Sequence, residues 1–331
     1  AADLARTASA SETALSNRNI VTNGAMQVAQ RSTSVTGISA SGYYTLDRFK
    51  IDNDASAGRF TMTQTADGPS GFANCLKLDC TTADTSIAAG EYLLIRQIFE
   101  GQDLQQLKKG TSDTESITVS FYVKGDQAAT YVCELLDIDN SRTITQAFAV
   151  TTSWNRIILT FPGDTTGALA DDNASSLSFN IWLHGGATFT GGTFASNTWA
   201  SVTQANRYAG SRTSFFDSTN RTFFITGVQM EVGPVATPFE HRSYGQELAL
   251  CQRYYLESRL PHLIATGNGE NDSSTVLPST MRAAPTVTLS SISNASLTVT
   301  TPTVNSFGWN GTTNNGAYGN YSFYFNCDSE L

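Results

Sequence analysis

Apolar and polar residues alternate along many short stretches of the chain, and Gly, Asn and Ser separate these stretches. In Ser116–Lys124 (SITVSFYVK) Ile117, Val119, Phe121 and Val123 alternate with other residues, so we expect one face of this strand to be buried and the other to face outward. The same reasoning predicts strands at Gly58–Gln64, Glu91–Phe99, Thr130–Leu136, Asn155–Phe161, Leu177–Leu183 and Thr222–Val232. Because no helical period separates them, residues 17–242 are predicted to form an all-β domain, an antiparallel β-sandwich of the jelly-roll type.

The pattern changes at residue 243. Ser243, followed three residues later by Gln246, forms a capping box, which is a common start of a helix. Pro261 then interrupts the pattern, because proline lacks the N–H that a continuing helix needs. We therefore predict a connecting α-helix over 243–260. Its predicted buried face consists of Leu248, Cys251 and Tyr255.

Residues 261–331 return to a β pattern. The candidate strands are Thr286–Leu289, Ser296–Thr300 and Tyr321–Asn326. The segment Gly308–Asn320 (GWNGTTNNGAYGN) is rich in Gly and Asn and is predicted to form turns. A β unit of about seventy residues buries little core by itself. We therefore expect a C-terminal β oligomerisation module that associates with its copies in a homotrimer.

Two further segments lack a clear strand or helix pattern. Residues 1–16 are Ala-rich and polar, with Leu4, Ala8 and Leu15 spaced so that a helix would place them on one face. We interpret this segment either as a leader or as the end of an oligomeric stalk. The Gly-rich segment Gly185–Arg212 is too long for a hairpin loop, and such long loops are usually functional or disordered.

Few residues are charged, and the balance is acidic. Charged residues make up 15% of the chain and the net charge is −9. Nucleic acids and anionic membrane surfaces both require clusters of Lys and Arg, so neither is expected as a partner. No stretch approaches the ~18 apolar residues that a membrane span requires, so we expect no membrane insertion.

The cysteines are scattered and form no C-x-x-C pair and no zinc-type spacing. We interpret them as reduced thiols that pack as small apolar groups. They are Cys75, Cys80, Cys133, Cys251 and Cys327. Because the first sixteen residues lack the apolar region of a signal peptide, we expect synthesis in a cytoplasm. The missing initiator Met suggests that the numbering begins inside a longer chain.

The sequence contains no recognisable hydrolase motif. None of His184, His241 and His262 has a metal-ligand or paired spacing, and the nucleophile motif G-x-S-x-G is absent. A glycosidase needs two carboxylates ~5–9 Å apart in space, which sequence spacing does not report. The candidate acids, which we expect on the solvated face, are Glu91, Glu134, Asp137 and Glu231. We therefore expect the protein not to be an enzyme.

One short segment resembles part of a calcium-binding loop. Asp137, Asp139 and Asn140 match its first half, but the Gly and the distal Glu that complete an EF-hand are missing. A turn is the preferred interpretation, and these three residues stay weak candidates for a Ca²⁺ site. No other cofactor is expected.

Aromatic residues that lie among Gly, Asn, Thr and Ser, and that we expect to be exposed, are the best candidates for a binding site. A sugar site needs a flat ring that stacks on a pyranose and neutral groups that hydrogen-bond its hydroxyls. The candidates are Trp199, Tyr208, Trp309, Tyr318 and Tyr321. The alternative interpretation is that these rings anchor a loop or a subunit interface.

The opening of the chain contains a recognisable motif. Residues 19–34 (NIVTNGAMQVAQRSTS), followed by Asp47-Arg48-Phe49, resemble the opening N-x-I-x-N-G-x-M-x-x-x-Q-R-G-T-S … D-R-[FW] of a large family of bacteriophage tail-fibre and virion-associated proteins. Ser32 stands where glycine is usual in this family. From their position beside a predicted strand, we expect Asp47 and Arg48 to be scaffold residues.

Two later passages extend the resemblance. Residues 224–255 (FITGVQMEVGPVATPFEHRSYGQELALCQRYY) are similar to the signature that closes the sandwich of this family and leads into its helix. Residues 281–288 (MRAAPTVT) and 328–331 (DSEL) resemble its C-terminal module. The resemblance implies a jelly-roll similar to carbohydrate-binding modules, placed on a phage tail and commonly trimeric. It implies no catalytic residues.

The expected function is that of a bacteriophage tail fibre or receptor-binding structural protein in the virion. Its expected partners are its own copies, other phage tail proteins and a bacterial surface glycan that it contacts non-covalently. Two alternatives stay open. One is a purely structural fibre or decoration subunit without a receptor site. The other is a tailspike depolymerase, although tailspikes usually carry a repetitive β-helix and no such period occurs in this sequence.

Overall fold

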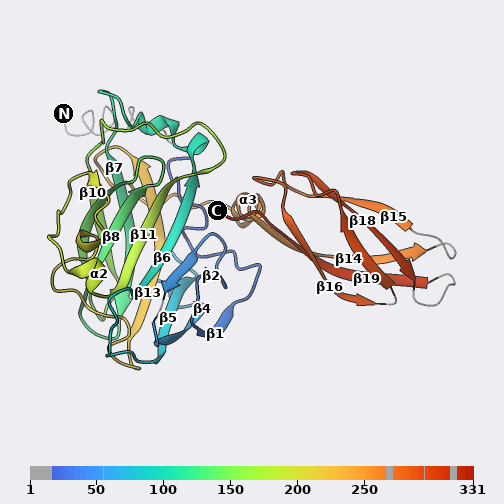
Figure 1. Ribbon diagram of the computed structural model, residues 1–331, viewed down its shortest axis with the longest axis horizontal. Coiled ribbons are helices and arrows are strands. Elements are labelled where there is room, and N and C mark those ends of the chain that lie inside the picture. Colours follow the sequence, from blue (N-terminus) through green and yellow to red (C-terminus); the bar gives the residue numbers. More distant parts are fainter. Residues whose placement is uncertain (1–16, 55, 266–270, 294, 314–318) are drawn as a thin grey trace. The chain divides into compact units, whose positions relative to one another are not determined.

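The computed structural model describes residues 17–54, 56–265, 271–293, 295–313 and 319–331 (Figure 1). The chain folds into two compact units, of which the first ends at Arg242 and the second begins at Ser243. The segment 1–16, predicted to be a leader or a stalk end, lies outside the described residues.

The first unit consists of two antiparallel sheets. The six-stranded sheet is ordered β1 (Ser34–Ile38), β4 (Arg59–Thr65), β5 (Cys75–Thr82), β13 (Thr222–Val232), β7 (Ile117–Gly125) and β10 (Asn155–Phe161). The seven-stranded sheet is ordered β12 (Ala200–Ser201), β9 (Arg142–Val150), β8 (Ala129–Asp137), β11 (Ser175–Gly185), β6 (Tyr92–Glu100), β3 (Lys50–Asp54) and β2 (Gly42–Tyr43). Neighbouring strands pair antiparallel throughout. The predicted all-β antiparallel sandwich of the jelly-roll type is confirmed.

Every strand predicted in this unit is present, and β10 and β13 have the predicted bounds. The sequence pattern missed β1, β2, β3, β5, β9 and β12. Strand β3 (KIDND) is rich in charged and amide side chains, so its composition favours a turn. It pairs with β6 on one side and with β2 on the other, and this pairing fixes it as a strand.

Aromatic rings from both sheets meet between them. The ring centroid of Phe121 in β7 lies 5.1 Å from that of Phe148 in β9 and 6.3 Å from that of Phe179 in β11. The alternate residues Val119 and Val123 are also fully buried, as the alternation in this strand predicts. Burying a large apolar side chain contributes ~1.5–3 kcal/mol, so this shared core holds the two sheets together.

The opposite face of β7 is buried in part, so the prediction that it faces outward is wrong for Thr118 and Ser120, whereas Tyr122 and Lys124 are partly exposed. Thr118 is 0% exposed and Ser120 is 1% exposed. The Thr118 hydroxyl donates to the Gly233 carbonyl at 2.7 Å, and the Arg156 guanidinium donates to Ser120 at 3.1 Å and to the Thr237 carbonyl at 2.5 Å. The chain after β13 therefore satisfies polar groups that the alternation assigned to water.

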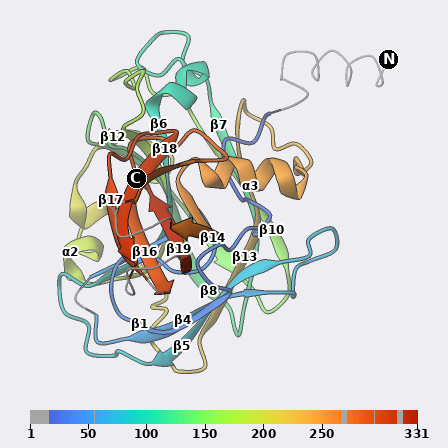
Figure 2. The same cartoon turned by 90° about the vertical axis from the view of Figure 1, so that its right-hand side faces the viewer.

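The long segment after β11 runs over the outer side of the seven-stranded sheet. It contains the one-turn helix α2 (Ala187–Thr190), strand β12 and the 3-10 turn η3 (Gln204–Asn206). Both ribbon views place α2 on the outside of the sandwich (Figures 1 and 2). Two other 3-10 turns, η1 (Gly101–Asp103) and η2 (Gln105–Leu107), follow β6.

The second unit contains helix α3 (Tyr244–Gln252) and two three-stranded antiparallel sheets. One sheet is ordered β14 (Tyr255–Ala265), β19 (Gly319–Asp328) and β16 (Thr286–Ser293), and the other is ordered β15 (Asn271–Val276), β18 (Ser306–Thr313) and β17 (Ala295–Thr300). The three strands predicted here are confirmed as β16, β17 and β19. The buried core of the unit is formed by Leu256, Leu277, Met281, Phe307, Trp309, Phe323, Phe325 and Cys327.

Helix α3 has the predicted start but is shorter than predicted. The Ser243 and Gln246 side chains each accept from the other residue's backbone N–H, which confirms the capping box. The helix ends at Gln252, and Tyr255 already pairs with Asp328 in β19. Pro261 lies within β14, at a shift of register between Leu260 and Leu263, and does not end a helix. Burial of Tyr254, Tyr255 and Leu256 stabilises the extended chain here.

The Gly- and Asn-rich segment Gly308–Asn320 was predicted to form turns, but β18 continues to Thr313 and β19 begins at Gly319. The reason is visible in β18, where Phe307 and Trp309 alternate with smaller residues and enter the core. Two buried rings therefore outweigh the local turn preference of Gly and Asn.

All five cysteines are free and buried, which confirms that they pack as small apolar groups. Burial raises the pKa of the Cys75 and Cys80 thiols to about 11 and that of Cys327 to about 12. Within the part of the chain that the structure describes, no helix is both long and apolar enough to cross a membrane.

Candidate functional site

The outer face of the seven-stranded sheet carries polar and aromatic side chains in register. Strand β11 alternates Leu177, Phe179 and Ile181, which enter the core, with Ser178, Asn180 and Trp182 on the other face. Across the sheet Asn180 pairs with Arg96 of β6, and Trp182 pairs with Leu94, which in turn pairs with Asp52 of β3.

Glu134 of β8 lies at the centre of this face and is fully buried. Arg207 donates to both of its carboxylate oxygens, at 2.7 and 2.8 Å. The Asn180 amide and the Trp182 indole N–H donate to it at 2.9 and 2.8 Å. Burial raises the pKa of Glu134, but Arg207 and the hydrogen bonds outweigh this effect and hold the pKa below its usual value.

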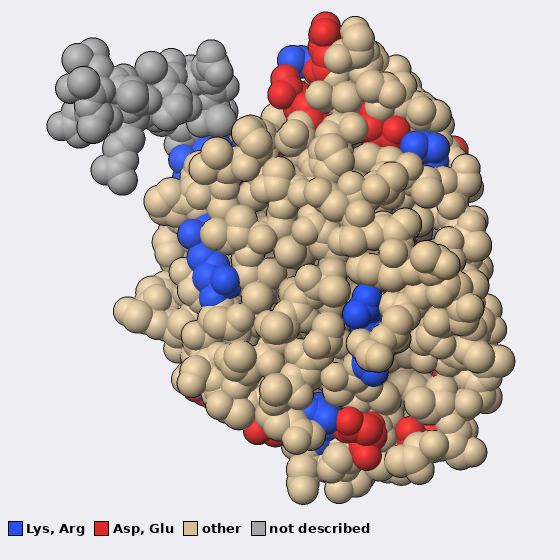
Figure 3. All heavy atoms as spheres, turned by 90° about the vertical axis from the view of Figure 1, so that its left-hand side faces the viewer, with Lys and Arg blue, Asp and Glu red and all other residues tan. Residues whose placement is uncertain are grey.

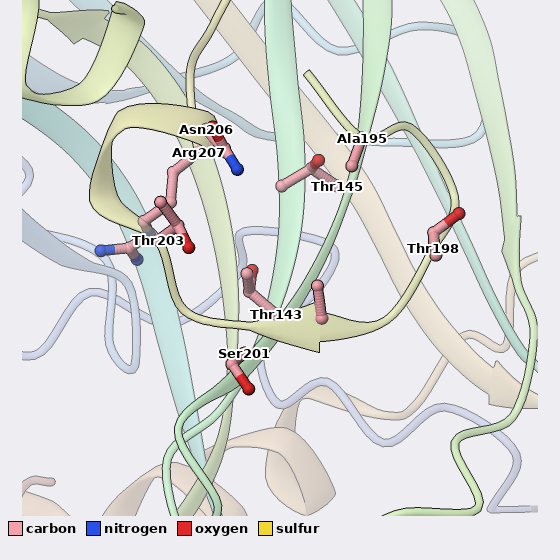
Figure 4. A pocket seen from close by; sticks show the side chains of 9 residues that line it. Thr143, Thr145, Ala195, Thr198, Ser201, Thr203, Asn206 and Arg207 are labelled. Atoms are coloured by element: carbon pink, nitrogen blue, oxygen red, sulfur yellow. The ribbon is translucent and has the colours of Figure 1, made fainter. Parts of the chain in front are cut away.

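Arg207 ends a segment that we call the strap, residues 192–207, which crosses the sheet from its β9 edge. Strand β12 pairs with β9, and the Asn197 and Val202 amides donate to the Thr145 and Ser141 carbonyls at 2.8 and 2.9 Å. Figure 4 shows the strap looping around Thr143 and Thr145. The hollow enclosed there has a volume of about 20 Å³, which is room for a water molecule and no more.

A larger hollow lies on the other side of Arg207, and we call it the sheet groove. Its volume is about 230 Å³. The strap contributes one wall of the groove. The strands β3, β6, β8 and β11 contribute the floor and the opposite side. The ring of Phe189 in α2 completes the lining. The lining residues are Asp52, Tyr92, Leu94, Arg96, Leu136, Trp182, Phe189, Gln204 and Arg207.

The polar groups of the groove are held by one another. Arg96 donates to one Asp52 oxygen at 2.7 Å, and the Tyr92 hydroxyl donates to the other at 3.3 Å. Burial raises the pKa of Asp52, but the hydrogen bond from Arg96 outweighs it, and the pKa lies below its usual value. Burial, followed by the Asp52 charge, raises the pKa of Tyr92 to about 12, so its hydroxyl stays protonated at neutral pH.

This combination can bind a polyhydroxylated molecule. Tyr92 and Phe189 provide apolar ring surface, with their centroids 5.3 Å apart. The Gln204 amide, the Tyr92 hydroxyl and the Asp52 carboxylate provide donors and acceptors within the same hollow. Ligand sites typically combine apolar lining with a few fixed polar groups, and a sugar needs both.

The predicted binding residues of the long loop lie beside the groove and do not line it. Tyr208 was expected to be exposed, but it is 2% exposed, its ring stacks on Trp182 and its hydroxyl donates to the Thr213 carbonyl at 2.8 Å. Trp199 is half-buried, and its indole N–H donates to the Pro162 carbonyl at 2.8 Å. Both rings are held by contacts within the first unit.

The remaining three predicted binding residues belong to the second unit. Trp309 was also expected to be exposed, but it is 2% exposed and packs in the core against Phe323, with ring centroids 5.5 Å apart. Tyr321 lies in β19, opposite Leu263, and its side chain lies outside what the structure describes. Tyr318 lies outside the described residues.

The acids that were considered for catalysis are buried, so the expectation that they lie on the solvated face is wrong. Glu134 is held by Arg207, Glu91 lies 3.3 Å from the His184 ring nitrogen Nε2, and Glu231 accepts from Thr237 and Gln229. Each of these carboxylates is therefore held in a separate hydrogen-bonded arrangement.

Asp137, Asp139 and Asn140, the candidates for a calcium site, form a turn in which Asp137 is paired with a lysine. The Lys109 ammonium lies 2.5 Å from Asp137, and the Asn140 backbone and side-chain amides donate to the same carboxylate. Asp139 accepts from the Ala170 amide and the Ser176 hydroxyl. Among the described residues no group of three His, Cys, Asp or Glu side chains is arranged to hold a metal.

The residues that line the groove were not among the predicted candidates, because those candidates are aromatic residues expected to be exposed in loops. A usable signal was present in LSFNIWL, where Ser178, Asn180 and Trp182 occupy the positions that alternate with the core residues. An indole and two polar groups on the outer face of a central strand indicate a covered or ligand-binding face.

The motif at the start of the chain holds the scaffold. Asn19 donates to the Val228 carbonyl at 3.1 Å and accepts from the Val21 and Met230 amides. The Asn23 side-chain amide donates to both the Val28 and the Asp47 carbonyls. A Cβ atom at Gly24 would lie 2.1 Å from the Val228 carbonyl oxygen, so only glycine fits there.

The adjacent Asp-Arg pair has the same role. Asp47 accepts from the Gln30 backbone and side-chain amides, and Arg48 donates to the Ile98 carbonyl at 2.5 Å. The expectation that Asp47 and Arg48 are scaffold residues is confirmed. The residues that carry the family resemblance at this end of the chain are therefore distinct from the lining of the groove.

The second unit has a hollow of its own, with a volume of about 550 Å³. Arg282, Thr286, Asn326 and Glu330 are among its lining residues, and none of its lining residues is aromatic. It lacks the ring surface that makes the sheet groove the better candidate for a sugar.

The first unit is an antiparallel jelly-roll sandwich with a groove on the outer face of one sheet. No protein-family model matches the sequence, and no curated protein matches it significantly. Solved structures that match part of the chain include a family 4 carbohydrate-binding module, with 11% identity and a TM-score of 0.32 over 63% of this chain and 97% of that chain. A family 11 carbohydrate-binding module from Clostridium thermocellum, solved with a mixed-linked tetrasaccharide, has 10% identity and a TM-score of 0.31 over 62% and 98%. The enzymatically active domain of tailspike protein 4 of bacteriophage CBA120 has 12% identity and a TM-score of 0.31 over 65% of this chain and 21% of that chain.

Proposed function

We propose that this protein is a receptor-binding or tail-fibre protein of a bacteriophage, which binds a bacterial surface glycan non-covalently in the sheet groove. The observation that carries the proposal is the groove itself, where ring surface and neutral hydrogen-bonding groups line one hollow of about 230 Å³. The protein is proposed to act in the virion tail after synthesis in the host cytoplasm, and to have no catalytic role.

The placement on a phage tail is supported by the sequence motifs at residues 19–34 and 224–255. These motifs have a shared structural purpose, because Asn19 and Gly24 from the first fit against Val228 and Met230 from the second. An antibody against the purified chain should label the tail of virions of the virus that encodes it. Labelling of the capsid alone would contradict this part of the proposal.

The surface charge is compatible with a neutral ligand. On the face of the molecule in Figure 3, the Lys and Arg side chains lie apart from one another and most of the surface is uncharged. An extended basic surface, which polyanions require, is not seen on this face.

A glycan array with the purified protein tests the proposed activity. The Gln204→Ala variant should weaken binding of the best glycan about three- to tenfold, since a neutral hydrogen bond contributes about 0.5–1.5 kcal/mol. Gln106→Ala is the matched control, because Gln106 is exposed and also makes one side-chain hydrogen bond, far from the groove lining. Absence of binding to every glycan would favour a purely structural subunit, and turnover of a bound glycan would favour a depolymerase.

The second unit is proposed to associate as a homotrimer with copies of itself and to join other tail proteins. Large apolar side chains are exposed on it, with Val276 79% and Tyr324 41% exposed in the single chain. Light scattering should give about three times the 35.5 kDa chain mass, and Val276→Asp should lower it. Val235→Asp is the control, because Val235 is 68% exposed in the first unit. A monomeric unmodified chain would contradict the trimer.

A further inference from the structure

We infer that the sheet groove takes the end of a neutral glycan, one or two sugar rings, and excludes acidic sugars and the interior of long chains. This inference rests on the proposed glycan binding and adds the class of ligand. Three features of the groove support it: its charges, its closure by the strap, and its size.

The charged groups of the groove are already paired. Arg96 lies 2.7 Å from Asp52, and Arg207 lies 2.7 Å from Glu134. Two further charges on β3, Lys50 and Asp54, have opposite signs. An acidic sugar would bring a carboxylate into a hollow whose cations are each held by a carboxylate, so its desolvation would not be offset. Neutral hydroxyls encounter no such cost, because they donate to Asp52 and accept from the guanidinium groups.

The strap limits the direction in which a chain could extend. It covers the outer face of β9, and the hollow beneath it has a volume of only about 20 Å³ (Figure 4). Backbone hydrogen bonds to Ser141 and Thr145 and the Trp199 indole bond to Pro162 hold it there. A glycan lying in the groove therefore meets a wall of Gln204 and Arg207 and cannot continue across β9.

The size of the groove sets the number of sugar rings. Its volume of about 230 Å³ is below the ~300–1,000 Å³ of pockets that enclose drug-sized ligands. The face of Trp182 is already covered, because Tyr208 stacks on it with ring centroids 5.7 Å apart and Arg207 lies 4.8 Å from the ring centroid. Phe189 is only 8% exposed, so Tyr92, which is half-buried, offers the larger ring surface to the ligand, and this surface fits one or two rings.

The experiment presents neutral disaccharides of glucose and galactose in two positions on an array, at the non-reducing end of a chain and as internal units. Uronic acid disaccharides are presented in the same two positions. We expect binding to a neutral terminal disaccharide at least about tenfold tighter than to the same unit inside a chain. This binding should change little when the salt concentration rises, because no new ion pair forms.

The outcomes separate the two proposals. Tighter binding of an internal unit or of a uronic acid would overturn the inference and leave glycan binding in place. No binding to any member of the array would overturn both. Binding to neutral terminal units alone would support both.

A pair of tryptophan variants tests the role of the strap. Trp199→Ala removes the bond that fixes the strap to Pro162, so internal units should gain binding relative to terminal ones. Trp154→Ala is a matched control on the opposite sheet, because its indole donates to the Asp67 carbonyl at 3.1 Å and lies 5.2 Å from the Lys124 ammonium, as Trp199 lies 5.3 Å from Lys109. An unchanged preference in Trp199→Ala, with the fold intact by circular dichroism, would contradict the strap as the limiting wall.

Discussion

The two outer faces of the sandwich both carry polar side chains, but the chain covers them in different ways. On the six-stranded sheet, Glu231 accepts from the Thr237 amide and hydroxyl, and the Glu240 amide donates to Gln229. The segment that follows β13 thus lies flat over its own sheet. On the seven-stranded sheet, the strap covers β9 and leaves the groove over β3, β6, β8 and β11.

The difference shows how a jelly-roll separates scaffold from site. The covering of the six-stranded sheet continues through Glu240, which accepts from the Asn17 and Asn19 amides and so joins the two ends of the unit. The strap, in contrast, is fixed by the pairing of β12 with β9, by the Trp199 indole bond to Pro162 and by the buried ion pair of Arg207 with Glu134. The chain covers the six-stranded sheet only in part, since Ile158 of β10 is 52% exposed and the Lys77 and Asp79 side chains of β5 are 30% and 32% exposed. The part that it covers is structural, whereas the strap leaves a hollow beside the part that it covers.

The largest expected effect concerns the anchor of the strap. Arg207→Ala should lower the free energy of unfolding by about 3–5 kcal/mol, because it leaves the buried Glu134 carboxylate without its cation. Urea denaturation followed by tryptophan fluorescence would measure this loss.

The double variant Glu134→Gln/Arg207→Met is the control for this effect. It removes both charges, so stability should recover most of the loss, whereas glycan binding in the groove should stay impaired because Arg207 lines it. If the double variant were as unstable as Arg207→Ala, the packing of Arg207 on Trp182, and not its charge, would hold the strap.

A smaller loss is expected beside β13 of the six-stranded sheet. Asn19→Ala removes three buried side-chain bonds, to Val21, Val228 and Met230, and should cost about 1–3 kcal/mol. Glycan binding should be unaffected once the fold is intact. Asn155→Ala is the control, because the Asn155 side chain makes only contacts of 3.4 Å at a more exposed position. Loss of binding in Asn19→Ala at full folding would place the site near Asn19 and β13.

The strands of the sandwich core could be predicted because their apolar residues alternate. Ile117 to Val123 in β7 is an example, and the periodicity holds whatever the partner strands are. The burial of Thr118 and Ser120 could not be predicted, because it depends on the chain near Gly233 and Thr237, which is distant in sequence. The alternation of apolar and polar residues indicates that the two faces of a strand differ. It does not indicate which other part of the chain covers the polar face.

The candidate site was harder to predict than the fold. The groove is lined by Asp52, Tyr92, Arg96 and Gln204, which come from three separate segments. The pairing of β3 with β6 brings the first three together, and the strap adds Gln204. Tyr208 was predicted to be exposed because Gly and Asn surround it, but a Gly-rich backbone also allows a loop to fold back closely on a sheet. Local composition was therefore no guide to its burial.

An acid titration should affect the face of the groove. The folded-state pKa values of Glu134 and Asp52 lie below their unfolded values of about 4. Their contribution to stability is therefore complete above the unfolded pKa and is lost as the pH falls through the folded pKa. We expect unfolding free energy to fall below about pH 4.5, by up to about 1.4 kcal/mol per pH unit for each group. The double variant Glu134→Gln/Arg207→Met should lack the contribution of Glu134 to this pH dependence. If the free energy of unfolding fell equally steeply with pH in the unmodified protein and in the double variant, this assignment would be contradicted.

The smallest expected effect comes from a single hydroxyl. Tyr92→Phe keeps the ring that contacts Phe189 and removes the hydroxyl 3.3 Å from Asp52, so the free energy of unfolding should change by about 0.5 kcal/mol or less. Glycan affinity should fall about threefold, because a ligand hydroxyl loses one neutral partner. Tyr44→Phe is the control, since the Tyr44 hydroxyl donates to the Ala40 carbonyl at 2.8 Å and does not line the groove. Calorimetric titration with the best glycan of the array would measure both variants. If Tyr44→Phe weakened binding and Tyr92→Phe did not, the glycan would lie outside the sheet groove.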